Sequence, residues 1–334
     1  MKNSLSNSIS KFFSIYLSKQ RNVSKNTILS YRDTFKLFFR FLKLKNVDID
    51  RLTIEHLNKA LIEEFLVWLS EERSCSPATI NNRLNALCCY VNYIKYDDPL
   101  NLMALNQILN IPLKKGQTKN IDHLSVDQIK LLFSVFDTSS KHEFRDYVLI
   151  RLMYETGARV QEVVDLKIRD FTDCNKPLIR IFGKGRKYRT LPLDVDLAEL
   201  LRKYITGYVN NSDSQHLFQG PQRASITRQG IQYILNKYCL RAHAIDNNFP
   251  KHIHCHMLRH SKAFHMLAND IPLIIIRDFL GHSSVETTQV YARSDTSLKE
   301  KALSKTRGIV DNPDMPDWED CPDIMNFLES LNVK

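Results

Sequence analysis

The chain has 334 residues, of which 43% are hydrophobic and 25% carry charge, with only 9 glycines and 11 prolines. This balance is typical of a folded globular protein and excludes disordered, collagen-like and low-complexity chains, and the length predicts two domains. The longest apolar runs are short, such as the six residues of 271–276, whereas a membrane span needs about 18. The net charge of +10 favours a polyanionic partner, above all nucleic acid.

The charge is unevenly distributed along the chain. Residues 1–110 carry 15 basic and 10 acidic groups (net +5), residues 111–310 carry 31 and 20 (net +11), and residues 311–334 carry 1 and 7 (net −6). Two basic segments can follow a phosphate backbone, whereas the acidic tail would avoid one. The seven cysteines include no CxxC pair and the N-terminus has no apolar signal core, so we expect a cytoplasmic protein with reduced thiols.

The first 110 residues have the apolar spacing of a small helical bundle. Apolar residues recur at intervals of three and four near residues 9–17, 24–42, 53–72 and 76–94. Ser24 and Ser76 are expected to cap the second and fourth helices, the latter with Pro77 at its first position. The aromatic residues on these faces are expected to form the core rather than to stack on bases.

Residues 111–122 are the predicted linker between two domains. They contain a proline, a glycine and the three lysines Lys114, Lys115 and Lys119, and they have no apolar period. Two interpretations remain open at this stage. A basic linker could cross a DNA backbone, or it could be a solvated tether.

The second domain, 123–310, is predicted to be mainly helical with one small antiparallel β-sheet. Residues 178–182 and 190–193 have strand character and flank the turn Gly183-Lys184-Gly185, which predicts a hairpin. The predicted helices cover residues 125–136, 143–155, 194–209, 226–240, 257–268, 272–280 and 284–291.

The tail, 311–334, is predicted to be an acidic connector followed by a short docking helix. Three prolines in 311–322 favour an extended chain, and Asp323 can cap a helix that carries Ile324, Phe327, Leu328 and Leu331 on one face. A helix of about ten residues is too short to be stable alone, so we expect its apolar face to dock into a groove on a protein surface. That groove could belong to its own catalytic domain or to a neighbouring protomer.

Four short motifs in the second domain carry side chains suited to phosphate chemistry. They contain, in order, Arg159 and Glu162, then Lys184 with Arg186 and Lys187, then His256 and Arg259, then His282 and Tyr291. Arginine forks toward phosphate oxygens, and residues three apart, such as His256 and Arg259, share a helical face. Together the cations could form a pocket for one phosphate, which a tyrosine could attack. No carboxylate cluster suggests a metal site.

Each motif alone has a simpler interpretation. Arg159 and Glu162 could be an ion pair at the start of a surface helix, and Lys184 could lie in a solvated turn. His282 could follow an ordinary helix cap, and Tyr291 could be a packing residue. The crowded segment His252, His254, Cys255 and His256, with His260 and His265 beyond, could bind zinc, but adjacent residues rarely converge on one metal. We therefore expect no metal.

The joint occurrence of these motifs resembles the tyrosine recombinase (phage integrase) family, in particular its Xer-type and simple transposon-integrase branch. The resemblance covers residues from about 7 to about 300. It implies that Arg159 and Arg259 hold the phosphate, that His256 and His282 add hydrogen bonds and handle protons, that Lys184 protonates the leaving 5′-oxygen and that Tyr291 forms a 3′-phosphotyrosyl bond. Glu162 would support the pocket.

The resemblance also implies an architecture and partners. Residues 1–110 would be a core-binding (SAM-like) domain and 123–310 the catalytic domain, closing as a C-shaped clamp on double-stranded DNA. Contacts to the DNA backbone are expected from Lys114, Lys115, Lys119, Arg186 and Lys187. The protein would need no cofactor and would act as a homotetramer on two duplexes or with a partner recombinase.

Two alternatives to a site-specific recombinase stay open on the sequence. A type IB topoisomerase-like enzyme could use similar residues to nick and reseal one strand, although the core-binding domain and the tail favour a recombinase. A non-catalytic DNA-binding relative could keep the fold, although Tyr291, both arginines and Lys184 are all present.

Overall fold

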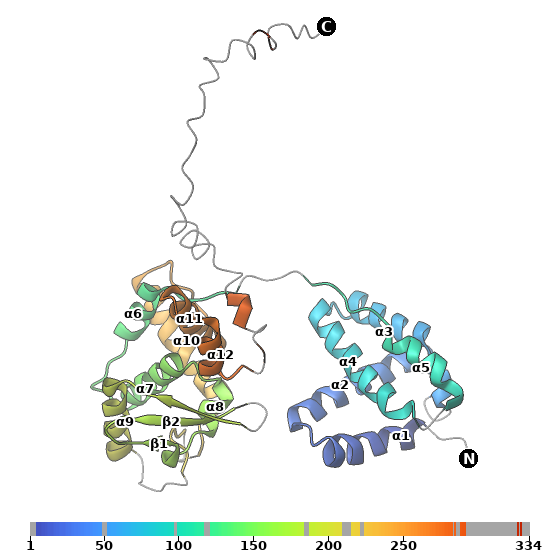
Figure 1. Cartoon of the computed structure of the whole chain (residues 1–334), viewed down its shortest axis with the longest axis horizontal. Coiled ribbons are helices and arrows are strands. Elements are labelled where there is room, and N and C mark those ends of the chain that lie inside the picture. Colours follow the sequence, from blue (N-terminus) through green and yellow to red (C-terminus); the bar gives the residue numbers. More distant parts are fainter. Residues whose placement is uncertain are drawn as a thin grey trace. The chain divides into compact units, whose positions relative to one another are not determined.

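The structure, a computed structural model, describes residues 5–48, 52–96, 99–116, 121–183, 187–208, 215–220, 224–282, 284, 288–291, 326 and 328. The chain divides into two compact units, Met1–Lys119 and Asn120–Lys334, and Figure 1 labels the main elements of each. The division falls inside the segment 111–122. Within the described ranges, every helix is too short or too polar to cross a membrane.

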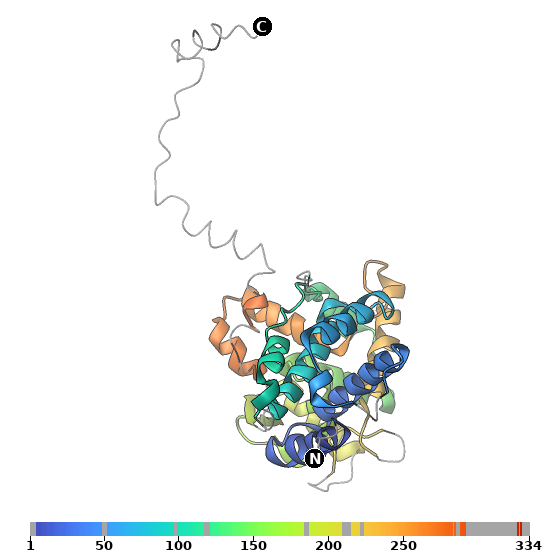
Figure 2. The same ribbon diagram turned by 90° about the vertical axis from the view of Figure 1, so that its right-hand side faces the viewer.

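The first unit is entirely helical, and Figure 2 looks onto its helices, coloured blue to teal. Its elements are α1 (Leu5–Lys11), the π-helix η1 (Phe12–Gln20), α2 (Lys25–Leu44), the 3-10 helix η3 (Ile54–His56), α3 (Lys59–Glu71), α4 (Pro77–Ile94), the 3-10 helix η4 (Pro99–Asn101) and α5 (Leu102–Leu109).

Side-chain caps begin the long helices of this unit as the sequence predicts. The hydroxyls of Ser24 and Ser76 accept hydrogen bonds from backbone N–H groups in the first turns of α2 and α4. The predicted helix 53–72 was wrong as one element, because it breaks at Leu57 and restarts after Asn58, whose side chain accepts from the N–H of Leu61. Two N-cap residues five positions apart, Thr53 and Asn58, therefore divide the segment into two helices.

The first predicted helix, 9–17, also differs from expectation, since it changes from α to π geometry at Phe12. The hydroxyls of Ser10 and Ser14 donate to the carbonyl oxygens of Ser6 and Ser10, at 2.9 and 2.7 Å. Ser18 donates to the carbonyl of Ser14 in the same way. Such back-bonding to the fourth preceding residue perturbs a helix, so this serine ladder is a local reason for the departure from α geometry.

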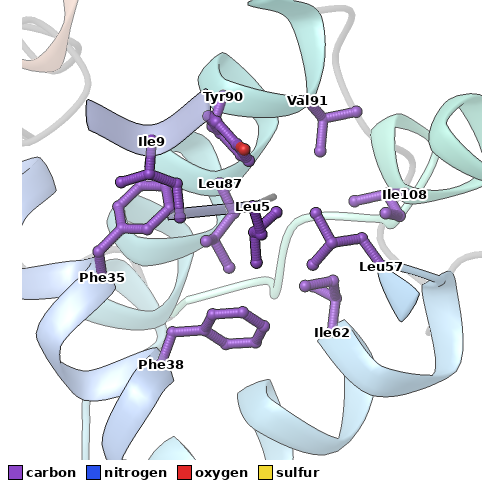
Figure 3. Close-up of a pocket in the computed structure, with 10 residues that line it drawn as sticks. All are labelled: Leu5, Ile9, Phe35, Phe38, Leu57, Ile62, Leu87, Tyr90, Val91 and Ile108. Atoms are coloured by element: carbon purple, nitrogen blue, oxygen red, sulfur yellow. The ribbon is translucent and has the colours of Figure 1, made fainter. Parts of the chain in front are cut away.

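The aromatic stripe of the first unit is core, as predicted. Phe12, Phe35, Phe38 and Phe65 are all at most 4% exposed and contact one another or neighbouring aromatic rings. Figure 3 shows the apolar side chains around the small cavity that remains among these helices. Its volume of about 10 Å³ is close to the room one water needs. The bundle is therefore closely packed and holds no ligand-sized void at this place.

The first half of the predicted linker is fixed to the first unit rather than free. Ile111 is only 8% exposed and packs in the core. The side chain of Asn81 on α4 makes two hydrogen bonds with the backbone of Lys114, each 2.9 Å long. The side chains of Lys114 and Lys115 remain exposed. Residues 117–120, including Lys119, lie outside the described ranges.

The second unit is mainly helical with one three-stranded antiparallel sheet, which confirms the predicted fold class. Its elements are α6 (Val126–Ser134), α7 (Lys141–Thr156), α8 (Val160–Asp165), the 3-10 helix η5 (Ile168–Asp170), β1 (Phe171–Thr172), β2 (Leu178–Phe182), β3 (Tyr188–Pro192), α9 (Val195–Tyr208), α10 (Arg228–Ile245), α11 (Cys255–Ala268) and α12 (Leu273–Leu280). Of the predicted helix 284–291, the structure describes a helical turn at 288–291.

The predicted hairpin exists and gains a third strand. Strands β2 and β3 pair with Phe182 opposite Tyr188, and β1 pairs with the outer edge of β2. Ile179 and Ile181 are fully buried while Arg180 between them is exposed, so one face of the sheet packs on the helices. With only two residues, β1 is too short to show a period in the sequence.

Two buried clusters make up the interior of the second unit. The larger one joins α6–α10, the sheet and the start of α11, and the smaller one joins the end of α11 to α12 and Tyr291. The candidate site lies where these clusters meet. Of the predicted tail helix, only Asn326 and Leu328 are described, both helical, and the rest of 311–334 lies outside the described residues.

Candidate active site

Arg159 is positioned by a sharp turn between two helices. Gly157 ends α7 with a left-handed φ of 56°, and a Cβ at this position would lie 2.7 Å from Cδ2 of Leu280. Both the conformation and the space therefore require glycine. Arg159 then becomes the N-cap of α8, as the sequence predicts, and its side chain is 25% exposed.

Glu162 fixes two arginines at once. One of its carboxylate oxygens accepts from Nη1 of Arg159 at 2.7 Å, and the other accepts from the backbone N–H of Arg159 at 2.9 Å and from Nη2 of Arg189 at 2.7 Å. Burial alone would raise the pKa of Glu162, but the two arginines lower it below its usual range, so the carboxylate is charged. Because the side chain of Glu162 is only 6% exposed, its ion pair with Arg159 is not the surface ion pair that the sequence left as an alternative.

Arg189 on β3 is a residue of this pocket that the sequence analysis missed. Its side chain is 11% exposed, and it lies against two backbone turns. A Cβ on Gly183 would be 3.3 Å from its Nη1, and a Cβ on Gly281 would be 3.1 Å from the same atom. Arg189 therefore connects the hairpin that carries the Lys184 turn to α8 and to the end of α12.

Arg259 on α11 is almost completely buried, with 1% of its surface exposed. Its Nη1 donates to the carbonyl of Gly157 and its Nη2 to the carbonyl of Leu280, both at 2.7 Å. These carbonyls lie at the C-terminal ends of α7 and α12, where the helix dipoles favour a cation. Burial and the nearby Arg159 lower the pKa of Arg259, but a guanidinium remains protonated at neutral pH.

The two predicted histidines both lie within the influence of this arginine pair. His256 lies on the first turn of α11 and is exposed overall, but partial desolvation of its ring, followed by the charges of Arg259 and Arg159, lowers its pKa. His282 follows the C-cap Gly281, and its Nδ1 lies 2.9 Å from the hydroxyl of Thr288. Burial, followed by the charges of Arg259 and Arg159, lowers the pKa of His282 to about 4. Both imidazoles are therefore largely neutral at pH 7.

Tyr291 is buried, with 2% of its surface exposed. Its ring contacts those of Phe264 and His282, with centroids 5.3 and 6.4 Å apart, and its hydroxyl lies 2.9 Å from Nδ1 of His260. Burial raises the pKa of Tyr291, which the charges of Arg259 and Arg159 oppose in part. In the sequence His260 is notable only as part of the histidine-rich region after His252, and no catalytic role was predicted for it.

The remaining predicted residues are placed only in part. Lys184 and Arg186 lie outside the described residues. The ends of their turn are held by a 2.9 Å hydrogen bond from the N–H of Gly183 to the carbonyl of Lys187, whose side chain is exposed. Among the residues that the structure describes, no group of three or more His, Cys, Asp or Glu side chains is arranged to hold a metal ion.

The second unit therefore brings together Arg159, Arg259, His256, His282 and Tyr291, which come from segments far apart in the chain. Their mutual effects on one another's pKa place them within one electrostatic neighbourhood. A cationic pocket beside a phenol suits transfer of a phosphoryl group to the phenol oxygen, without a metal.

The chain matches the family described as "Phage integrase family" over residues 122–297, and "Phage integrase, N-terminal SAM-like domain" over residues 11–95. A "Putative integrase/recombinase y4rC" of Sinorhizobium fredii is 31% identical over 305 residues, which cover 91% of this chain and 92% of that protein. This chain belongs to the phage integrase family. The "Tyrosine recombinase XerD" of Rickettsia bellii is likewise 31% identical, over 308 residues that cover 88% of this chain and 96% of the relative.

A solved structure agrees with this assignment. The XerH site-specific recombinase, in a post-cleavage complex with its palindromic difH substrate, is 26% identical with a TM-score of 0.64, covering 85% of this chain and 81% of that one. The chain is thus a tyrosine recombinase, an enzyme of site-specific recombination, as the sequence predicts. Its relatives favour this class over a topoisomerase.

Proposed function

We propose that this tyrosine recombinase cleaves and rejoins double-stranded DNA through a covalent bond between Tyr291 and a 3′-phosphate. The phenol oxygen attacks phosphorus, the bond from phosphorus to the 5′-oxygen breaks, and that oxygen takes up a proton as it leaves. A 5′-hydroxyl then attacks the phosphotyrosine, which restores the tyrosine. The observation that carries the proposal is the place of Tyr291, whose ring contacts that of His282 and whose pKa is affected by the charges of Arg259 and Arg159.

The two arginines are proposed to hold the non-bridging oxygens of the reacting phosphate. Arg159 keeps a quarter of its side chain exposed while Glu162 fixes its Nη1, so its other nitrogens can face DNA. Arg259 uses one N–H on each terminal nitrogen for carbonyls, and a guanidinium has five N–H donors, so three remain for phosphate. Donors fixed before DNA arrives can stabilise the transition state without reorganisation.

The neutral histidines are proposed to add hydrogen bonds and to handle protons. His256 is exposed on the first turn of α11, where a phosphate could reach it, and His282 is oriented through its contact with Thr288. A neutral imidazole can donate one hydrogen bond and accept another. Neither residue needs a cofactor for this role.

A suicide substrate tests the proposal. A nicked duplex that loses its short 5′ fragment after cleavage traps the covalent intermediate, because no strand remains to reverse it. Incubated with a substrate that carries the enzyme's own recombination site, the wild-type protein should form an adduct that resists denaturation. Digestion and mass analysis should map the adduct to the peptide that contains Tyr291. No adduct, or an adduct on another peptide, would contradict the proposal.

Lys184 is proposed to protonate the leaving 5′-oxygen, by its place in the Gly183-Lys184-Gly185 turn. An alkoxide is a poor leaving group, so Lys184→Ala should slow cleavage of a normal phosphodiester by about 10²–10⁴-fold. In a substrate with sulfur in place of the bridging 5′-oxygen, the leaving group is a thiolate, which departs without protonation. This substrate should restore most of the cleavage rate of Lys184→Ala. If sulfur does not restore it, the acid is another group, with His256 the next candidate.

Both units are proposed to contact the duplex, with 1–110 as the core-binding domain and 123–310 as the catalytic domain. The exposed Lys114, Lys115 and Lys187 are candidates for backbone contacts, together with Lys119 and Arg186. Several solved relatives are complexes with DNA, which supports DNA as the partner.

The tail, 311–334, is proposed to link protomers in a tetramer on two duplexes, or to link a protomer to a partner recombinase. Its net charge of −6 suits a basic protein surface better than DNA. Truncation after Asp311 should leave binding to a single site within about twofold of wild type but abolish two-site complexes and recombination. If the truncated protein recombines at the wild-type rate, the tail has no such role.

A further inference from the structure

Tyr291 is docked on α11 at a place removed from the exposed His256. His256, His260 and Phe264 are spaced by four residues, so they form one row along the helix, with about 6 Å between successive positions. The ring of Tyr291 contacts the second and third members of this row, with centroid distances of 5.6 Å to His260 and 5.3 Å to Phe264. Its hydroxyl is held at the second member, 2.9 Å from Nδ1 of His260.

The burial of Tyr291 is incompatible with attack from this position. An attacking oxygen must come within about 3–3.5 Å of phosphorus and in line with the leaving group. Tyr291 is only 2% exposed and its hydroxyl is engaged by Nδ1 of His260, so in this position the hydroxyl is not presented to a phosphate. Cleavage therefore requires the hydroxyl of Tyr291 to leave its contact with His260.

We propose that His260 is a positioning residue that holds the nucleophile at a resting place about one turn of α11 away from His256, so that breaking this hydrogen bond is part of the barrier to cleavage. The inference rests on the proposed function of Tyr291. It assigns to His260 a contact with the nucleophile before the reaction and no role in the chemical step itself.

The electrostatics of the pair are consistent with a neutral hydrogen bond. Burial, together with His256 and Arg259, lowers the pKa of His260 to about 4, and burial raises the pKa of Tyr291. At neutral pH the phenol O–H therefore donates and Nδ1 of the imidazole accepts. This hydrogen bond holds the hydroxyl of Tyr291 while both partners stay neutral. Releasing Tyr291 therefore costs about the free energy of one neutral hydrogen bond.

The test is the rate of first-strand cleavage in a single turnover, with the suicide substrate at saturating concentration. His260→Phe keeps an aromatic ring against Tyr291 and His256 but removes the acceptor. Because a neutral hydrogen bond is a modest net interaction, we expect this variant to cleave about two- to tenfold faster than wild type. His260→Gln, which can still accept a hydrogen bond, should cleave at a rate closer to wild type.

His265→Phe is the matched control. His265 lies on the same helix and makes the same kind of contact, with Nδ1 2.8 Å from the hydroxyl of Tyr154 instead of Tyr291. Its replacement removes one tyrosine–histidine hydrogen bond from α11 without touching the nucleophile. We expect a wild-type cleavage rate and a fall in melting temperature similar to that of His260→Phe.

The outcomes separate the possibilities. Slower cleavage by His260→Phe, for example by the 10²–10⁴-fold typical of a lost general base, would overturn the proposal and make His260 a catalytic residue. An unchanged rate, or the same acceleration by His265→Phe, would overturn it in favour of packing alone. If Tyr291→Phe still forms the adduct, the proposed function itself fails, independently of what His260 does.

Discussion

Tyr291→Phe is expected to abolish the covalent protein–DNA adduct while the protein stays folded and binds DNA. The substitution removes one oxygen and keeps the ring that packs on Phe264 and His282. Loss of the nucleophile in an enzyme that works through a covalent intermediate typically lowers the rate by on the order of 10⁶-fold, so no cleavage should be detected. The measurement is adduct formation on the suicide substrate, resolved on a denaturing gel.

Tyr154→Phe supplies the control for that experiment. Like Tyr291, Tyr154 shares a hydrogen bond with a histidine of α11, but it is only partly buried, and its pKa is raised by burial and Glu155 rather than affected by the arginine pair. This variant should form adduct at the wild-type rate. Titration of DNA binding against salt should give the same slope for wild type and both variants, because neither phenol neutralises a phosphate in the bound state. Any adduct formed by Tyr291→Phe would place the nucleophile elsewhere.

The parts of the fold that were predictable depend on local interactions. A cap such as Ser24, Ser76 or Ser125 accepts a hydrogen bond from a residue three positions later, so its signal lies within a few residues of sequence. The left-handed Gly157 and Gly281 end their helices for an equally local reason. These signals place Arg159 at a helix start and His282 just beyond a helix end, as predicted.

The parts that were missed depend on contacts between distant segments. Arg189 reaches Glu162 across 27 positions, and His260 reaches Tyr291 across 31. Nothing near Arg189 in the chain distinguishes it from the other basic residues of the hairpin. The one available signal was indirect, since Gly183 and Gly281 both leave room for the Arg189 side chain. Only the folded chain shows that one side chain occupies both spaces.

The arginines of the pocket differ in what holds them, and this difference predicts separate phenotypes. Arg159 is held by a carboxylate, so its positive charge is offset before DNA arrives. Arg259 is held by two neutral carbonyls at helix ends and has no anionic partner among its described hydrogen bonds. The reacting phosphate would be the anion that completes its environment. Arg259 should therefore contribute more to cleavage than any other single cation of the pocket.

Arg259→Ala is accordingly expected to lower cleavage by at least about 10²–10³-fold, the usual cost of removing one fixed donor from a transition state. Binding should weaken far less, with the salt slope falling by about one unit, because Arg259 is one phosphate contact among several. The measurements are single-turnover cleavage at saturating DNA and binding across a salt series. Equal losses in cleavage and binding would count against the assignment, since a transition-state contact acts mainly on the rate.

Stability must be separated from catalysis in this experiment, because Arg259→Ala leaves the carbonyls of Gly157 and Leu280 without their donor. Each unpaired buried carbonyl costs about 1–3 kcal/mol, so the melting temperature should fall. Arg145→Ala is the matched control, since Arg145 also donates to a carbonyl, that of Gln219, and pairs with the buried Asp146. The Arg145→Ala variant should be destabilised yet cleave at the wild-type rate below its melting temperature.

Arg259→Lys keeps the charge but has three donors instead of five, too few to hold both helix ends and to bind a phosphate bidentately. It should therefore remain close to Arg259→Ala in cleavage, and a return to the wild-type rate would show that charge alone is sufficient.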